Sequence, residues 1–265
     1  MLAAANNLIR RWYVLLIAAA LVVVPIVSGI AKANEGAMRS NFDVYTQLMI
    51  SPVSLLVPII AVMLGCMRAY DIIGNRYVSY TRTRVAVRRY ISGELGAAFI
   101  VPFAAFFLLS FVGIILAFYI WPLLGNPSID PGTYEMSSAQ ALKDDLTRTS
   151  FSSLLAWGPL VYGIIYSTWL GLGAATYAAL GFAALVVLHN RLLALLLPFI
   201  VYFLPTIVVS LLGSPELSPM YSLMPFGLIQ APIWVAALPT LLVILLVTVI
   251  WSRLYMSMPT LPRLA

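Results

Sequence analysis

Charged residues are scarce in this sequence: they make up 9% of its 265 residues, whereas 62% are hydrophobic. A soluble domain usually has about a quarter of its residues charged. A chain so poor in charge cannot cover a water-soluble fold of this size with polar surface, and its mean hydropathy of +1.00 agrees. The composition therefore excludes an ordinary soluble domain and indicates a membrane protein.

Residues that perform common chemistry are also scarce. The chain has one cysteine, Cys66, and one histidine, His189, which excludes an intramolecular disulfide and leaves no cluster for a metal ion. The two lysines, Lys32 and Lys143, precede Ala and Asp, whereas the lysine of a phosphate-binding P-loop precedes Ser or Thr. We therefore expect no ATP hydrolysis, no other enzymatic activity and no cofactor in this chain.

Long uncharged intervals occupy most of the sequence instead. A bilayer core is crossed by roughly 20 apolar residues in a helix, and the intervals do not alternate in polarity as barrel strands do. We expect an all-α, polytopic integral membrane protein in which residues 1–265 form a single transmembrane domain. The six expected transmembrane helices are Trp12–Ile30, Val53–Met67, Leu95–Leu123, Leu154–Leu188, Leu192–Leu212 and Ile233–Trp251.

The basic residues predict the orientation, because they gather on the cytoplasmic side of membrane proteins. With the N-terminus inside, few basic residues remain outside; they are Lys32, Arg39, Lys143 and Arg148. The cytoplasmic ones would be Arg10, Arg11, Arg68, Arg76, Arg82, Arg84, Arg88, Arg89, Arg191, Arg253 and Arg263. We therefore expect both termini in the cytoplasm. The expected location is a bacterial plasma (inner) membrane. The basic net charge of +6 reflects this topology, and no nucleic acid is expected as a partner.

The interval Leu154–Leu188 is longer than one span requires. Cutting it near Gly171 and Gly173 would give seven spans and would move the last arginines outside, which removes the charge asymmetry. The six-span topology is therefore preferred, with tilt or protrusion accounting for the extra length. The glycines of this interval, with Gly163 and Gly181, form a small-residue stripe that we expect to serve helix packing.

The remaining connections are polar. The longest are Lys32–Ser51, Arg68–Arg89 and Gly125–Ser153, and the last could hold a short external helix around Ala139–Leu146. Arg68–Leu95 is the most informative, reading RAYDIIGNRYVSYTRTRVAVRRYISGEL. At helical spacing its tyrosines and arginines share one face, which predicts an amphipathic helix at the cytoplasmic surface. The alternative is a topological anchor whose arginines bind lipid phosphates.

This stretch resembles the membrane subunits of type-2 ATP-binding-cassette (ABC) exporters, in which an acidic residue, a glycine, a basic pair and Tyr-Ile-x-Gly precede the third span. In that family the segment is a coupling helix that docks in a groove of the ATPase. The resemblance implies a cytoplasmic coupling helix that begins at Asp71, with Ile72 and Ile73 as apolar anchors. Glu94 departs from the family, which often has lysine there. The implied coupling residues are Asp71, Ile72, Ile73, Gly74, Arg76, Tyr77, Tyr80, Arg84 and Arg88.

The resemblance also implies the other subunits of the transporter and its cargo. The chain would be a permease working as a homo- or heterodimer of membrane subunits, with ATP and Mg²⁺ held by separate cytoplasmic ABC ATPase subunits. Its cargo would be amphipathic or hydrophobic, such as a drug, lipid or peptide. The proline-rich segment Gly213–Pro232 would form short re-entrant helices before the last span, with a tight apolar hairpin as the alternative. The alternative function is a membrane assembly or interaction protein that recruits partners without transport.

The six-span topology predicts which positions face the cytoplasm. Single cysteines placed at Ser79, Asn190 and Ser257 in a Cys66→Ala background should resist an impermeant thiol reagent in intact cells, because the membrane shields all three. Labelling after the membrane is opened provides the control for reactivity. Labelling of Asn190 and Ser257 in intact cells, but not of Ser79, would establish seven spans instead.

Overall fold

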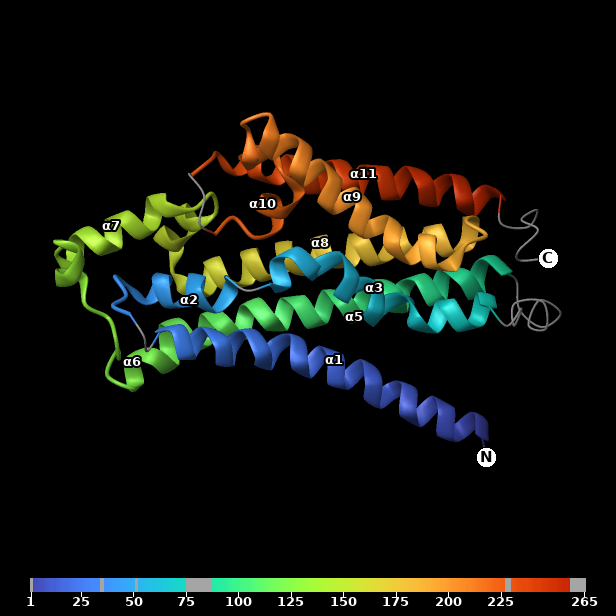
Figure 1. The fold of residues 1–265 in the computed structure, drawn as a ribbon, viewed down its shortest axis with the longest axis horizontal. Helices are drawn as coiled ribbons and strands as arrows, with labels where there is room; N and C mark the ends of the chain where they lie inside the picture. Colours follow the sequence, from blue (N-terminus) through green and yellow to red (C-terminus); the bar gives the residue numbers. More distant parts are fainter. Residues whose placement is uncertain (1, 34–35, 51, 75–86, 227–229, 258–265) are drawn as a thin grey trace.

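The structure, a computed structural model, describes residues 2–33, 36–50, 52–74, 87–226 and 230–257. These residues form an elongated bundle of long helices, in which the first described helix begins and the last described helix ends at the same end of the bundle (Figure 1). We call this the terminal end. The opposite end holds the short helix α7 (Ser138–Arg148) and is called the α7 end.

Among the described residues, six helices are long and apolar enough to cross a membrane, which confirms the six expected spans, and no β-strand element occurs. They are α1 (Leu2–Ala33), α3 (Val53–Gly74), α5 (Val87–Ile115), α8 (Pro159–Val187), α9 (Arg191–Leu211) and α11 (Ile233–Ser257). The third span continues beyond α5 through a π-helical turn (Leu116–Ile120) and α6 (Trp121–Leu123). The all-α fold of a polytopic membrane protein is thus confirmed.

The helix α8 decides between six and seven spans. It runs without interruption from Pro159 to Val187, through the glycines at which a seventh span would have been cut. The apolar residues before it form a separate 3-10 helix, Ser152–Trp157, which accounts for the length of the uncharged interval. The seven-span alternative is therefore wrong.

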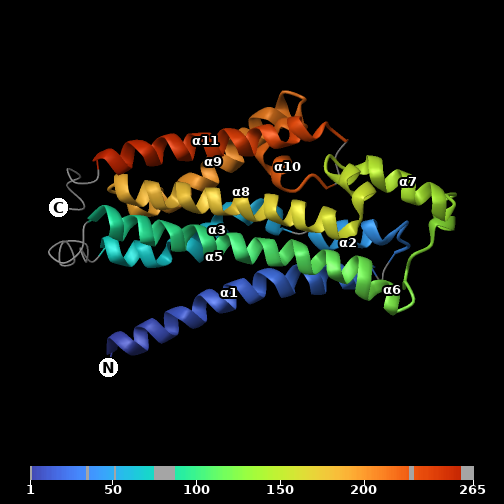
Figure 2. The same ribbon diagram turned by 180° about the vertical axis from the view of Figure 1, so that it is seen from behind.

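The same helix is the centre of the bundle, with α9 and α11 on one side of it and α3 and α5 on the other (Figure 2). In its most apolar stretch 89% of the residues are buried by protein, compared with 17% in α1 and in α9, 22% in α11, and 39% in α3 and in the third span. Five of the six spans therefore present much of their surface to the lipid, while α8 contacts mostly protein.

Glycine makes this central position possible. A Cβ atom on Gly171 would lie 2.8 Å from the backbone oxygen of Phe103 in α5, and one on Gly65 of α3 would lie 2.4 Å from the backbone oxygen of Ala98. Real Cβ atoms do not come so close, so these helices touch along their backbones. The interpretation of the glycines in α8 as a packing stripe is confirmed, as small residues allow such contact within membranes.

A short helix inside the bundle, α2 (Asn41–Met49), lies where the sequence predicts only a polar connection, Lys32–Ser51. Ser40 caps its start by accepting a hydrogen bond from the Asp43 amide. Its apolar side chains are buried against α1, where a Cβ on Gly29 would lie 2.7 Å from Leu48. The buried residues of α2 are Phe42, Asp43, Val44, Tyr45, Leu48 and Met49.

The segment before the last span also folds back into the bundle, through a 3-10 turn (Pro215–Leu217) and the helix α10 (Pro219–Leu223). Leu223 packs against Gly173 of α8. Since a helix rises about 1.5 Å per residue, Gly173 lies about 20 Å along α8 from its first residue. The segment therefore re-enters the bundle, and a superficial hairpin does not describe it.

The short helix predicted around Ala139–Leu146 is confirmed as α7, and its external side stays a prediction. Ser137 and Gln140 form a reciprocal capping box at its start, which satisfies backbone N–H groups that lack partners in the first turn.

The glycine contacts predict a position-specific effect on stability. Gly65→Ala and Gly171→Ala should each lower the free energy of unfolding by about 1–3 kcal/mol, the usual cost of overpacking a core, because backbone atoms of α5 block the added methyl group. Gly96→Ala is the matched control, since its Cβ would meet nothing within 4 Å, and it should be neutral or stabilising. Thermal unfolding of the purified chain in detergent measures this, and equal effects at all three positions would contradict the close approach.

Candidate functional site

Five of the nine residues predicted to couple to an ATPase lie in the described part of the chain, and these five are at the terminal end. The helix α3 ends with Asp71–Gly74, and Arg88 lies in the first turn of α5. Outside the described residues lie Arg76, Tyr77, Tyr80 and Arg84. The prediction that Asp71 begins a separate coupling helix is wrong, because Asp71–Gly74 continue the second span. No proline or glycine interrupts the chain between Met67 and Gly74, so the helix extends beyond its apolar stretch.

The two isoleucines of this turn pack inside the protein. Ile73 is 7% exposed and belongs to a buried cluster with Ala69 and Ile91, against which the half-buried Ile72 also packs. They hold the ends of α3 and α5 together, so their assignment as free anchors for an ATPase does not fit their burial. The substitution Ile73→Asp would bury an unpaired charge and destabilise the fold. If that variant lost a binding partner, the loss would therefore report unfolding rather than a broken contact with the partner.

An ion pair joins the helices that flank the α3–α5 connection. The Arg68 guanidinium of α3 lies 2.8 Å from the Glu94 carboxylate of α5. The Glu94 side chain is 9% exposed and that of Arg68 is 64% exposed, so the arginine reaches from the surface to a carboxylate that the fold has buried. Glu94 is the residue at which the sequence departs from the ABC exporter pattern, and this contact shows what it binds.

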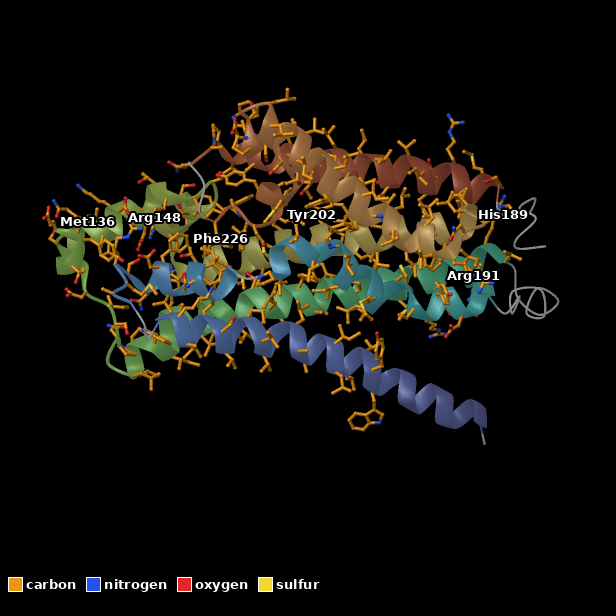
Figure 3. The ribbon with its side chains drawn as sticks, in the orientation of Figure 1. Met136, Arg148, His189, Arg191, Tyr202 and Phe226 are labelled. Atoms are coloured by element: carbon orange, nitrogen blue, oxygen red, sulfur yellow. The ribbon has the colours of Figure 1, made fainter. Side chains whose placement is uncertain are left out.

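Two further arginines bind aromatic rings of other spans at the same end. The Arg88 guanidinium lies 5.3 Å from the ring centre of Tyr255 in α11 and donates a hydrogen bond to the Met256 carbonyl. The guanidinium of Arg191, at the start of α9, lies 5.5 Å from the ring centre of Tyr70 in α3, at the end shown in Figure 3. Arginine contacts therefore join four spans around the two ends of the α3–α5 connection.

At the α7 end, aromatic rings fill the centre of the bundle. Tyr45 of α2 lies edge-on to Tyr162 and Tyr166 of α8, with ring centres 6.0 and 6.4 Å away. It also lies edge-on to Phe226, which follows α10 (Figure 3), at 5.6 Å. Such pairs each contribute about 0.5–1.5 kcal/mol beyond their buried area. The rings thus bind α2 and the α10 segment to α8 and to each other.

Hydrogen bonds from hydroxyl and indole groups near these rings hold the two short helices α2 and α10 in place. The Tyr45 hydroxyl shares a hydrogen bond of 2.9 Å with Ser110 of α5. The Tyr166 hydroxyl donates to the Leu223 carbonyl at 2.6 Å, and the Trp169 indole donates to the Ser222 carbonyl at 2.8 Å. Because a short helix leaves carbonyls unpaired and lipid offers them no donor, these side chains of α8 make the position of α10 possible.

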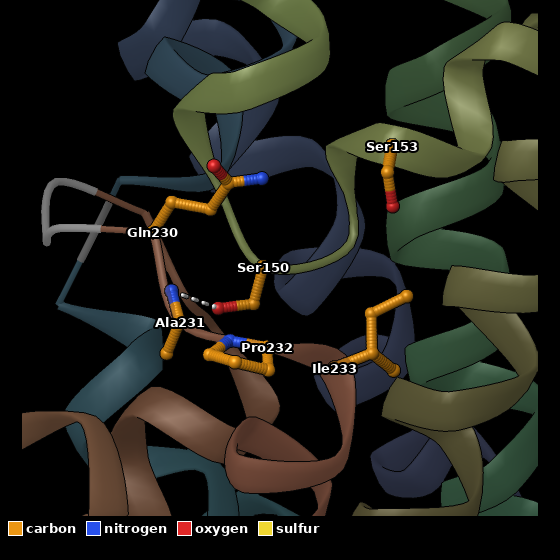
Figure 4. Close-up of a pocket in the computed structure, with 6 residues that line it drawn as sticks. All are labelled: Ser150, Ser153, Gln230, Ala231, Pro232 and Ile233. Carbon is orange, nitrogen blue, oxygen red and sulfur yellow. Dashed lines mark hydrogen bonds between the residues drawn. The ribbon is translucent and has the colours of Figure 1, made fainter.

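A pocket of about 310 Å³ opens beside this region (Figure 4). Ser150 lines this pocket: it accepts a hydrogen bond from the Ala231 amide at 3.1 Å and shares one of 2.8 Å with the Tyr221 hydroxyl. The pocket therefore lies where the segment that precedes α8 contacts the segment that precedes α11. It is lined by Ser150, Ser153, Gln230, Ala231, Pro232 and Ile233.

Comparisons of the chain with protein-family models, with curated proteins and with solved structures found no match. Within the described ranges, no group of three or more His, Cys, Asp or Glu side chains could hold a metal ion. The function must therefore be inferred from the helices and contacts themselves.

The Arg68–Glu94 contact predicts an asymmetry between two variants. Arg68→Gln should cost more stability than Glu94→Gln, by about 1–3 kcal/mol, because it leaves a buried carboxylate without the charge that faces it. Glu94→Gln keeps a hydrogen-bond acceptor for the exposed arginine. Thermal unfolding in detergent compares them, with the double variant as the control, which should recover most of the loss. Equal small losses would mean that the contact is an ordinary surface ion pair.

Proposed function

We propose that this chain is the membrane-spanning subunit of an ABC exporter, and that a separate cytoplasmic ATPase drives it. The observation that carries the proposal is the terminal end of the bundle, where arginine contacts tie α3, α5, α9 and α11 around the α3–α5 connection. A partner that pulled on this connection would move four spans at once, as a coupling device requires.

The lack of an energy source in the chain supports this proposal. Neither lysine can serve a P-loop, and ion-coupled carriers usually hold ionisable groups inside their spans. The acidic residue nearest a span interior, Glu94, already faces Arg68. A transport protein of this composition would borrow its energy from another subunit, in which ATP and Mg²⁺ would bind.

The exposed arginines of the terminal end support the proposal that this end faces the cytoplasm. Arg68, Arg88, Arg89 and Arg253 are exposed there, and the predicted coupling residues between α3 and α5 add further arginines. Basic residues on the cytoplasmic side are the general rule, and an acidic rim on an ATPase would complement them. We infer a bacterial inner membrane as the location.

Packing supports a path between two membrane subunits. The centre of one bundle is filled by α8 and, at the α7 end, by the rings around Tyr45. A cargo would therefore pass along the outer, mostly apolar surface of the bundle, in a dimer with a second copy or a related subunit. That surface suits an amphipathic or hydrophobic cargo.

Copurification tests the proposal. The full chain, tagged and solubilised from its own membrane, should carry an ATPase with P-loop sequences that mass spectrometry identifies. Tyr77→Asp combined with Tyr80→Asp should reduce the bound ATPase at least tenfold, by the order of magnitude expected when two charges enter an apolar contact. Tyr134→Asp is the matched control, because Tyr134 is exposed at the α7 end, and it should leave the ATPase bound.

Two outcomes would contradict the proposal. If no ATPase accompanies the unaltered chain, the alternative of a membrane assembly protein replaces the exporter. If the tyrosine variant retains the ATPase while replacement of Arg82, Arg84, Arg88 and Arg89 by glutamine abolishes function, the connection acts as a lipid anchor rather than as a docking helix.

A further inference from the structure

The helix α7 lies outside the six spans and turns one face to the bundle. Ala141 and Asp145, one turn apart, are buried, at 3% and 5% exposed, whereas Leu142 is 67% exposed. Arg148 continues the buried face by one more turn. The face is thus polar, and it meets the residues that begin α2.

Three side-chain contacts join this face to the start of α2. The Arg39 guanidinium donates to the Asp144 carboxylate at 3.1 Å, and the Arg148 guanidinium donates to Asp43. Between them, the Ser40 hydroxyl donates to the Asp145 carboxylate at 2.7 Å.

Ser40 occupies a critical position, because it is also the residue that caps α2. Its oxygen accepts the Asp43 amide at 3.3 Å while its hydrogen goes to Asp145. The carboxyl group of α7 therefore acts on the first turn of the helix that carries Tyr45 into the aromatic centre of the bundle. A change at Asp145 can reach α2 through one hydrogen bond.

The charges in this group do not balance. The charged groups that act on Asp145 are Arg39 and Asp43 from the α2 side and Asp144 from α7 itself. Arg148 of α7 contacts Asp43 and Asp144 beside it. Each arginine contacts Asp43 and Asp144, and in the described part of the chain neither forms an ion pair with Asp145. Three carboxyl groups thus share two guanidinium groups in a mostly buried place, and one proton on Asp145 would make the group neutral.

Burial is the largest cause that raises the pKa of Asp145, which moves from 3.8 to about 7. The bond from Ser40 lowers this pKa, the charges of Asp43 and Asp144 raise it, and Arg39 lowers it. Since α7 lies outside the membrane spans, the carboxyl group can exchange protons with the solution on that side.

We propose that α7 is a pH-sensitive clasp on α2, closed when Asp145 is protonated and loosened when Asp145 is charged. The clasp stands on the contacts of Asp145, Ser40 and the two arginines, and it does not depend on an ATPase partner. Loosening would free the start of α2. It would thereby also loosen the aromatic rings packed around Tyr45 at the α7 end of the bundle.

The direction of the effect follows from linkage. In the closed state the pKa of Asp145 is about 7, whereas a solvated carboxyl group titrates near 3.9. The open state therefore binds fewer protons between these values, and the ratio of open to closed molecules rises as the pH rises. The rise is up to about 70-fold between pH 5 and pH 7.5, and the ratio levels off above the closed-state pKa.

Distance measurement between two spin labels tests the clasp in the full chain, reconstituted in lipid nanodiscs. Labels on cysteines at Leu142 of α7 and Leu123 of α6, both exposed, in a Cys66→Ala background report the position of α7 against the bundle. The distance distribution should gain a second component as the pH rises from 5 to 7.5. Asp145→Asn should keep the single low-pH distribution at both pH values, because its side chain is neutral at both.

Two further variants separate the clasp from a general effect of pH. Glu135→Gln, an exposed carboxyl group of the same connection, is the matched control and should keep the transition. Ser40→Gly removes the hydrogen bond but keeps a residue that helix starts accept, so its transition should extend to higher pH. A distribution that does not change with pH in the unaltered chain, or a transition that persists in Asp145→Asn, would overturn the proposal.

Discussion

The close contact of α8 with its neighbours is the constraint on which the other helices depend. Glycine at position 171 lets the α8 backbone touch that of α5, and Gly181 makes room for the side chains of Val62 in α3 and Pro198 in α9. A membrane interior offers little hydrophobic driving force between helices, so contact area and hydrogen bonds must hold them. Small residues on one helix supply that area on several sides, which is why α8 can be surrounded.

Burial of α8 has a second consequence at the α7 end. Side chains that would face lipid on an outer span instead face protein, and here they carry hydroxyl and indole groups. Tyr166 and Trp169 use them to bind the carbonyls at the end of α10, and Ser110 of α5 does the same for the Tyr45 hydroxyl. The helix α10 can enter the bundle because the central helix satisfies its carbonyls, whereas α5 satisfies the Tyr45 hydroxyl of α2.

The sequence predicted the parts of the fold that depend on length and polarity: the six spans, the continuity favoured for α8, and α7. It did not reveal α2, although Phe42, Tyr45 and Leu48 have helical spacing, because a short helix buried by protein has no length signature of its own. The end of α3 was missed for a related reason. Asp71 is charged, and polarity marks where a helix leaves the lipid rather than where it ends. The contacts of Glu94 and Asp145 could not be predicted, since their partners are far apart in sequence.

The third span connects the two ends of the bundle. Near its start α5 carries Glu94 and Arg88, which bind α3 and α11. Near its far end Ser110 binds Tyr45, and the Ala117 carbonyl, in the π-helical turn, accepts a hydrogen bond from the Asn41 side chain of α2. A tilt of this span would move the groups that it binds at both ends. Coupling free energies are reciprocal, so a partner at the terminal end that tilts α5 and releases α2 must itself bind more tightly when the clasp is open.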